Sequence, residues 1–527
     1  MSTEPVVLSE ALGGSALSRA ARAGQLGQWY PRTPRGAEWS DYTARVRASV
    51  SPSWYDDLAP AIAARGAAAA RLERAATHGI VVTTGQQPGL FGGPLMTLVK
   101  ALTARALADA LQDVTHMPVA PLFWAATDDA DFDEAAVVSV ALDGGARELR
   151  LEVRAPAGTP MTRVPLDQLE IDTLGTLLRD ACGSAPHGDF LGRVFDAYRG
   201  GTTVGDAYVT LLRGLLEPLE IGVLDASHPA LARAAAPTIG RAARAADTVA
   251  QAVRRRDADI VAAGFMPQVE EVKGLSLVSL NSGGIKRRLP IGEAATLSAI
   301  PRGDVLSSNV LLRPVVERTI MPTAAYLGGP GEVAYFAQVS AVAQALDLPV
   351  PLVLPRWSGT ILEPRIQRTL DDLGVGPDAL VDPHALEGRI ARERLPVETV
   401  AALSALRRDL DADVEKVRRA GTGLVADAVL DGLRRSLEHH LERLDRRIIA
   451  AAKRRESDLM RSIATARGAL YPDGVRQERK LAYAPFLARY GAGLLDQLLE
   501  AARVHTRALV TGGPALASPA PPATASV

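Results

Sequence analysis

One glycine-rich stretch carries amide side chains at a place where a ligand could bind. The segment TTGQQPGLFGG (83–93) puts Gln86 and Gln87 between a short apolar run and a helical pattern. Glycines let the backbone approach an anion closely, and Pro94 suits the first position of a helix, whose free N–H groups favour negative charge. The stretch is not a P-loop, because Lys100 comes too late for that motif. We expect a binding loop, with a tight structural turn as the alternative.

A second stretch gathers carboxylates behind another apolar run. In FWAATDDADFDE (123–134), Asp128, Asp129 and Asp131 follow residues typical of a buried strand. Clustered carboxylates can bind a metal, accept hydrogen bonds from hydroxyls or amines, or act as bases. The calcium-loop pattern is absent, and the alternative is a solvated acidic turn.

A third stretch repeats the logic of the first. Residues 307–338 contain Arg313 and then Gly-Gly-Pro-Gly-Glu at a second junction of strand and helix, where Glu332 suits the first helical turn. Arg356 follows the next predicted strand. The basic segment 283–290 is either a phosphate clamp or, more commonly, a solvated hairpin.

The elements around these stretches indicate a parallel sheet. Apolar runs alternate with amphipathic helices, which is typical of βαβ units covered on both faces. The predicted strands are 79–85, 117–127, 220–227, 322–329 and 349–355, the helix after the first is 95–111, a hairpin covers 137–153, and one long helix covers 229–256.

The pattern divides the chain into five regions. We predict an α/β core in which the parallel sheet carries two insertions, followed by an amphipathic helical region of coiled-coil type. In that region Leu430, Leu433 and Leu444 belong to a stripe that either packs within its own domain or helps to form a dimer. The predicted regions are 1–75 (helical), 76–365 (core, with insertions near 137–200 and 265–300), 366–470 (coiled coil), 471–510 (a segment packing back on the core) and 511–527 (a disordered tail).

Composition excludes several classes of protein. The formal net charge is −1, which gives no reason to expect nucleic-acid binding. Cys182 is the only cysteine, so neither an internal disulfide nor a four-cysteine zinc site can form, and we expect a structural thiol. The histidines show no metal-binding pattern, and no metal site is predicted. No secretory signal or membrane-spanning run is recognised, so a cytoplasmic protein is expected.

Four strings together resemble the bacillithiol biosynthesis cysteine-adding enzymes, the BshC family. They are TTGQQPGLFGGPLMTLVKALTARAL, PLFWAATDDADFDE, NVLLRPVVERTIMPTAAYLGGPGEVAYFAQV and VRQERKLAYAPFLARYG, in the family's order. The resemblance covers about residues 20 to 500 and implies a nucleotide-binding, Rossmann-like core with two connecting-peptide insertions. It also implies a coiled coil that promotes homodimers. The implied reaction is a ligation of cysteine to glucosaminyl-malate, with ATP activating the carboxyl group and the need for Mg²⁺ left open.

The resemblance also assigns site residues. The catalytic set that it implies consists of Gln86, Asp128, Asp129 and Asp131. The set that would bind substrate or nucleotide consists of Thr84, Gly85, Gln87, Gly89, Phe91, Gly93, Asn309, Arg313, Gly328, Gly329, Gly331, Glu332 and Tyr335, and we add Arg356 from its place after the next predicted strand.

One position departs from the family. Relatives typically carry histidine where this chain has Ala130. If that histidine is a base in relatives, Asp129 or Asp131 is the expected replacement. Two alternatives therefore remain: a diverged enzyme that joins another amino acid to an amine, and a dimeric homologue that binds ligands without catalysis.

Overall fold

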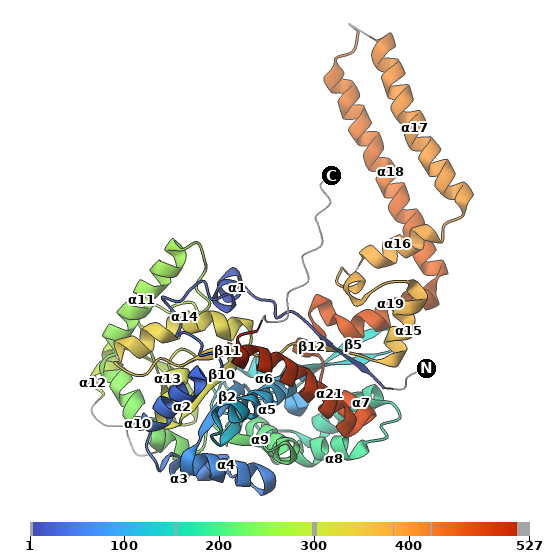
Figure 1. Cartoon of the computed structure of the whole chain (residues 1–527). Coiled ribbons are helices and arrows are strands. Elements are labelled where there is room, and N and C mark those ends of the chain that lie inside the picture. The colour runs from blue at the N-terminus through green and yellow to red at the C-terminus, as the bar shows by residue number, and fades with distance from the viewer. Residues whose placement is uncertain (1–3, 153–154, 298–302, 383, 422–423, 514–527) are drawn as a thin grey trace. The chain divides into compact units, whose positions relative to one another are not determined.

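The computed structural model divides into two compact units, each described here by itself (Figure 1). We call them the core unit and the helical unit. The core unit comprises Met1–Val140, Arg147–Leu362 and Gln477–Val527, and the helical unit comprises Ala141–Ala146 and Glu363–Arg476. The residues that the structure describes are 4–152, 155–297, 303–382, 384–421 and 424–513.

A five-stranded sheet forms the centre of the core unit, in the order β11-β10-β2-β3-β6. Its strands are β2 (Ile80–Gln86), β3 (Val119–Ala125), β6 (Gly222–Asp225), β10 (Thr323–Gly328) and β11 (Val353–Pro355). All neighbouring pairs are parallel. Chain order reverses between β2 and β10, as in Rossmann-like folds. The predicted fold class, an α/β core with a Rossmann-like parallel sheet, is confirmed.

Both faces of this sheet are buried under helices. Along β2, Val81 packs into one apolar cluster while Ile80 and Val82 pack into the other, because successive side chains of a strand point to opposite faces. The first cluster includes residues of α3 (Trp54–Ile62), α4 (Gly66–His78), α10 (Pro229–Arg244), α13 (Arg313–Ile320) and α14 (Pro330–Ala345). The second includes residues of α2 (Glu38–Ala48), α5 (Leu95–Thr115) and α21 (Ala484–Thr511).

The first insertion lies between β3 and β6. It begins with a hairpin, as expected, formed by β4 (Val137–Leu142) and β5 (Gly145–Arg150). The helices that follow are α7 (Gln168–Cys182), α8 (Gly188–Ala197) and α9 (Val204–Leu216), and the short α6 (Phe132–Ala135) precedes the hairpin.

The second insertion is a three-stranded antiparallel sheet between β6 and β10, in the order β8-β7-β9. Its strands are β7 (Leu275–Ser282), β8 (Ile285–Pro290) and β9 (Val305–Ser308), with α12 (Ile291–Thr296) between the last two. The single long helix predicted over 229–256 is wrong, since the chain forms α10 and then α11 (Ala246–Ala262). Ala245 between them leaves helical geometry, with φ −94° and ψ 18°.

The chain ends of the core unit add elements that the sequence did not predict. The strand β1 (Val6–Ser9) pairs antiparallel with β12 (Gly359–Leu362), although this region was expected to be helical, and α1 (Ala16–Arg22) follows it. Helix α21 packs against α5 and runs to Thr511, the first residue of the predicted disordered tail. Residues 514–527 of that tail lie outside the described residues.

The helical unit contains two long helices that lie side by side and antiparallel (Figure 1). These are α17 (Val397–Ala420) and α18 (Asp427–Arg455). Arg418 on α17 forms ion pairs with Asp427 and Asp431 on α18, both with N–O distances of 2.6 Å. The other helices of the unit are α15 (Pro364–Leu373), α16 (Ala385–Glu393) and α19 (Ser457–Leu470). None of the helices that the structure describes combines the length and apolar character that a membrane crossing requires.

Candidate functional site

The carboxyl ends of the five parallel strands meet at one cleft of about 1060 Å³ in the core unit. Ligands of open α/β sheets bind at this edge, next to the point where strand order reverses. The second insertion closes another side of the cleft. The lining includes Gly85–Gln87, Asp128–Ala130, Asp225–Pro229, Gly329–Glu332 and Arg356.

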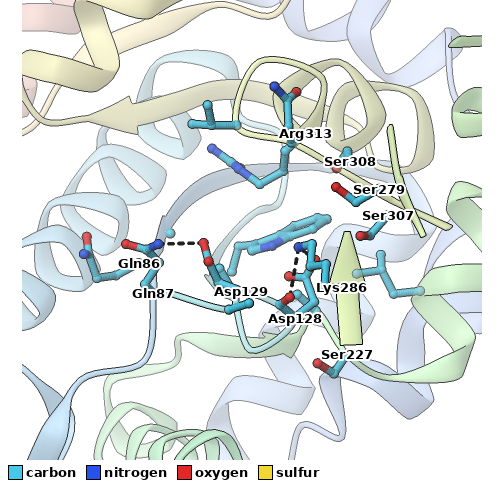
Figure 2. A pocket seen from close by; sticks show the side chains of 18 of the residues that line it. Gln86, Gln87, Asp128, Asp129, Ser227, Ser279, Lys286, Ser307, Ser308 and Arg313 are labelled. Atoms are coloured by element: carbon cyan, nitrogen blue, oxygen red, sulfur yellow. Dashed lines mark hydrogen bonds and ion pairs between the residues drawn. The ribbon is translucent and has the colours of Figure 1, made fainter. Parts of the chain in front are cut away.

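The two predicted polar stretches meet in this cleft. Gln87 donates from Nε2 to Oδ2 of Asp129 at 2.6 Å, and Figure 2 shows this contact near the middle of the pocket. Gln86 donates from its own Nε2 to Oε1 of Glu134 at 3.2 Å. Glu134 is exposed as a residue, yet its carboxylate faces the cleft. Partial burial, and then the carboxylates of Asp131 and Asp129, raise the pKa of Glu134.

A buried lysine joins the two glycine-rich loops. Lys100 on α5 is 3% exposed, and its ammonium donates to the Gly85 carbonyl at 2.8 Å and to Oε1 of Gln86 at 2.9 Å. The same ammonium lies 2.7 Å from Oε2 of Glu332, at the start of α14. Burial lowers the pKa of Lys100, and Glu332 opposes that shift. Lys100 therefore fixes the position of the Gln86 side chain and ties it to the third predicted stretch.

Glu332 is held as a carboxylate by its neighbours. Its oxygens accept hydrogen bonds from the Tyr326 hydroxyl and from the Gly329 N–H, the latter at 2.6 Å. Burial would raise the pKa of Glu332, but Lys100 and these two donors hold it below the ordinary glutamate value. Glu332 is thus an acid in the first turn of α14, as its position in the sequence suggested, and it also lines the cleft.

Arg313 presents a cation between two aromatic rings. Its guanidinium carbon lies 4.7 Å from the Tyr326 ring centre and 5.7 Å from the Trp124 ring centre, and its Nη1 is 2.8 Å from a Glu317 oxygen. Burial would lower the pKa of Arg313, but Tyr326, Tyr335 and Glu317 raise it above the ordinary value. The side chain therefore remains charged at the cleft wall and suits an anionic ligand group.

Arg356 is buried beneath the glycine-rich loop at α14. It is 1% exposed and forms a bidentate pair with Glu478 of the short helix α20 (Gln477–Lys480), at 2.8 and 2.7 Å. Its Nη1 also donates to the Trp357 carbonyl at 2.7 Å. The Nε has no hydrogen-bond partner among the described residues. Most of this guanidinium is committed to structure, so any contact with a ligand falls to Nε.

The basic hairpin of the second insertion is anchored at the acidic loop. Lys286 donates from Nζ to the carbonyl and to Oδ2 of Asp128, both at 2.9 Å, as Figure 2 shows for the side-chain pair. Burial would lower the pKa of Lys286, but Asp128 raises it. Arg287 instead points to solvent and pairs with Glu293 at 2.5 Å. The hairpin is therefore solvated at Arg287, while Lys286 binds it to the acidic loop through Asp128.

The structure brings together most of the residues that the resemblance assigned. Those that line the cleft are Gly85, Gln86, Gln87, Asp128, Asp129, Asn309, Arg313, Gly329, Gly331, Glu332, Tyr335 and Arg356. Those outside the lining are Thr84, Gly89, Phe91, Gly93, Gly328 and Asp131.

The outlying residues support the site from behind. Phe91 is fully buried against Phe195 and Tyr198, with ring centres 6.3 and 5.4 Å away. The Tyr198 hydroxyl donates to the Gly89 carbonyl at 2.6 Å and accepts from the Gly92 N–H at 3.1 Å. The second half of the glycine-rich stretch is therefore a packed turn, as the structural alternative proposed.

Two further expectations are corrected by hydrogen bonds. Asp131 caps α6, since its Oδ1 accepts from the Glu134 N–H at 3.2 Å. The N-terminus of α5, expected to attract an anion, donates its Leu95 N–H to the Leu481 carbonyl at 2.7 Å. Pro94 is the N-cap of that helix rather than its first residue.

Some lining residues were not selected from the sequence. They include Lys100, Ser227, Ser279, Ser307 and Arg479. A signal existed for Ser279, because LSLVSLNS (275–282) alternates apolar and polar residues as a half-buried strand does. No local signal could reveal Lys100, because its partner Glu332 comes from a distant part of the chain.

Neither a metal-binding cluster nor a reactive thiol is found among the described residues. Within the described ranges, no group of three or more His, Cys, Asp and Glu side chains is arranged to hold a metal ion. Cys182 is buried, and its Sγ contacts the Leu178 carbonyl at 3.1 Å. Burial raises the pKa of Cys182 to about 11, so the thiol stays protonated at neutral pH.

Comparison with known proteins now decides the family. The N-terminal Rossmann-like domain of bacillithiol biosynthesis BshC matches residues 55–283 and 297–357, and the C-terminal coiled-coil domain of BshC matches 359–508. The chain belongs to the BshC family. The predicted membership and coiled-coil domain are thereby confirmed. The matched Rossmann-like ranges contain the glycine-rich and acidic loops, while Lys286 lies between the two ranges.

Similar proteins of this family occur in several bacteria. A protein of Solibacter usitatus named "Putative cysteine ligase BshC" is 32% identical over 80% of this chain and 82% of its own length. Proteins with the same name from Koribacter versatilis and Salinibacter ruber are 30% and 29% identical, over 92% and 81% of this chain and 94% and 82% of their own lengths.

Proposed function

We propose that this protein is a cysteine ligase of bacillithiol biosynthesis, which joins L-cysteine to glucosaminyl-malate through an amide bond. The observation that carries the proposal is the family match across the segments that form the cleft. The relatives' shared name, which specifies a cysteine ligase, supports the reaction class. A free carboxylate does not react with an amine at a useful rate, so we assign ATP as the activating substrate.

The proposed chemistry has two steps. The cysteine carboxylate first attacks a phosphorus of ATP, giving an acyl-adenylate with pyrophosphate or an acyl-phosphate with ADP. The glucosamine nitrogen then attacks the acyl carbon. A C–N bond forms, the bond from carbon to the phosphoryl oxygen breaks, and AMP or phosphate leaves. The nitrogen must lose a proton in this second step.

We assign Glu134 as the acceptor of that proton, in place of a histidine at position 130. Asp129 accepts a bond from Gln87, and Asp128 is held by Lys286. The Glu134 carboxylate lines the cleft and, among the described residues, accepts only a long bond, 3.2 Å, from a glutamine amide. A carboxylate of raised pKa is a better base toward an ammonium group than an ordinary one.

The phosphate groups of ATP need a cationic binding site in the cleft. Arg313 offers a permanent charge at the cleft wall, beside the start of α14 at Gly329. Guanidinium groups favour phosphate and carboxylate oxygens. We therefore assign the phosphates of ATP to the part of the cleft that Arg313 lines.

A turnover assay tests the proposal. Purified protein is mixed with glucosaminyl-malate, cysteine and ATP, with and without Mg²⁺, and products are followed by mass spectrometry. Bacillithiol that appears only with ATP supports the ligase. A product only with another amino acid would indicate a diverged substrate, and ligand binding without any product would indicate a non-catalytic homologue. The nucleotide product, AMP or ADP, identifies the intermediate.

We extend the proposal to a cytoplasmic homodimer. Apolar side chains remain exposed on the paired helices, among them Val417 (50%), Leu433 (46%) and Leu444 (41%), which suits a second copy of the chain. ATP and free cysteine are available in the cytoplasm. Light scattering after gel filtration tests the dimer, and cell fractionation tests the location.

A further inference from the structure

The sheet of the second insertion turns a polar face toward the cleft. Val278 and Leu280 point to the other side, where they belong to the apolar core, and Leu306 of β9 belongs to the same core but also reaches the cleft. Between them, Ser279 and Asn281 of β7 face the cleft, as the two-residue period of a strand requires. The face toward the cleft is thus mostly polar, although Val305 of β9, opposite Asn281, also lies on it.

The pairing of the strands aligns the polar side chains of β7 with side chains of β8 and β9. Ser279 on β7 lies directly opposite Arg288 on β8 and Ser307 on β9. Asn281 lies opposite Lys286 on β8. All five residues line the cleft. Side chains opposite one another across strands lie about 5 Å apart, which is close enough to contact neighbouring hydroxyls of one small ring.

The hydroxyls of this face lack hydrogen-bond partners among the described residues. The Ser307 Oγ is buried and has no hydrogen-bond partner among the described residues. Ser279 is only 3% exposed, and no hydrogen bond joins its hydroxyl to another described residue. Buried polar groups in native proteins are normally hydrogen-bonded, so such hydroxyls on a cleft wall point to a ligand that completes them.

The two cations of the face are already engaged. Lys286 is bonded to Asp128, and Arg288 donates to the Ser276 carbonyl from Nε at 3.0 Å and from Nη2 at 2.8 Å. What remains for a ligand is chiefly neutral: hydroxyls, which donate and accept, and the amide of Asn281. This chemistry suits a polyhydroxylated ring better than a phosphate group.

The position of this polar face in the cleft would direct a bound ligand toward the acidic loop. Figure 2 shows Ser279 and Ser307 on one side of the pocket and Gln86 and Gln87 on the other, with Asp129 between. A ring resting on the serines would therefore hold a substituent toward the acidic loop.

We propose that the polar face of β7, β8 and β9 is the subsite for the sugar ring of the acceptor substrate. This inference rests on the proposed function. The glucosamine ring carries its hydroxyls beside the amine that reacts, so binding the ring here directs that amine toward the carboxylates. The ribose of ATP shares the hydroxyl chemistry and is the competing occupant that the experiment must separate.

The experiment compares Ser279→Ala, Ser307→Ala and the double variant with the wild-type protein. The matched control is Ser282→Ala, an exposed serine on the same strand that lies outside the cleft lining. KM is measured for glucosaminyl-malate, cysteine and ATP in turn, and calorimetry measures direct binding of glucosaminyl-malate and of malate alone.

The expected result is selective. The double variant should raise KM and Kd for glucosaminyl-malate at least tenfold, leave KM for cysteine and for ATP within twofold, and bind malate as the wild type does. An unchanged acceptor constant would overturn the subsite while the ligase reaction stands. A rise confined to ATP would overturn it in favour of ribose. Wild-type binding that the variant loses, without turnover in either protein, would support the subsite and count against the ligase. A wild type that does not bind glucosaminyl-malate would refute the subsite.

Discussion

Replacing Lys100 with methionine tests whether one buried ion pair holds the candidate site together. The ammonium of Lys100 is 2.7 Å from Glu332 and also donates to the Gly85 carbonyl and to Gln86. Methionine keeps most of the side chain's length but removes all three contacts. Glu332 then remains buried with only the Tyr326 hydroxyl and the Gly329 N–H as donors.

The expected loss of stability follows from burial. Both side chains are largely buried, with exposures of 4% for Lys100 and 19% for Glu332. Removing one member of a buried pair typically costs about 3–5 kcal/mol. The two remaining donors to Glu332 place Lys100→Met near the lower end, at about 3 kcal/mol. The double variant Lys100→Met/Glu332→Gln leaves no unpaired charge, so the two changes should be coupled by about 2 kcal/mol.

A lower pH should reduce the difference in the free energy of unfolding between the wild type and Lys100→Met. The folded-state pKa of Glu332 is lowered, so its contribution to stability is present above the unfolded-state pKa and is lost as pH falls through the folded-state value. Lys100 is one cause of that lowering. The free energy of unfolding of Lys100→Met should therefore approach that of the wild type as the solution is acidified.

Urea unfolding followed by circular dichroism measures these quantities. The matched control is Lys273→Met, an exposed lysine of the core unit, which should change stability by less than about 0.5 kcal/mol. The kcat of the proposed ligase reaction should also fall about 100-fold in Lys100→Met, because Gln86 loses the contact that positions it. A single variant as stable as the wild type, or a double variant as unstable as the sum of the singles, would refute the bracing role.

Three further outcomes are expected. Glu134→Gln should lower kcat about 100-fold or more and abolish the acid limb of the pH–rate profile. In the wild type that limb should lie above the ordinary glutamate range, because the pKa of Glu134 is raised. The control Asp133→Asn changes an exposed neighbour and should leave both kcat and the acid limb unchanged. Native protein should react with a thiol reagent at neutral pH only after unfolding, because burial raises the pKa of Cys182 to about 11, and rapid labelling of the folded chain would contradict this. Tyr198→Phe should destabilise the core unit by about 1–3 kcal/mol in thermal unfolding, since the Gly92 N–H and the Gly89 carbonyl lose their partner; an unchanged unfolding temperature would contradict this.

The sequence predicted the sheet because its signals are local. The apolar run of β2 and the amphipathic pattern of α5 can each be recognised within a short window. The break between α10 and α11 was missed because alanine-rich sequence continues through Ala245 without a helix-breaking residue. The strand β1 was missed because it pairs with β12, a strand that lies far away in the sequence.

The site was predictable where a strand end alone brings a residue to the cleft. Gln86 and Asp129 follow directly from this geometry. Phe91 belongs to the same glycine-rich stretch, but its place in the packed turn depends on Tyr198 from the first insertion. The sequence of β7 showed a polar face, yet nothing local could say that Ser307 would lie beside Ser279.

The acidic loop links the two insertions to each other. The Asp129 carbonyl accepts from the Met161 N–H of the first insertion at 2.9 Å, and Asp128 accepts from Lys286 of the second. The Lys286 N–H in turn donates to the Gly158 carbonyl at 2.8 Å. The insertions are therefore not interchangeable modules. A chimera that takes one of them from a homologue would break its match with the other, and grafting of new acceptor specificity would require both to be transplanted together with the loop they share.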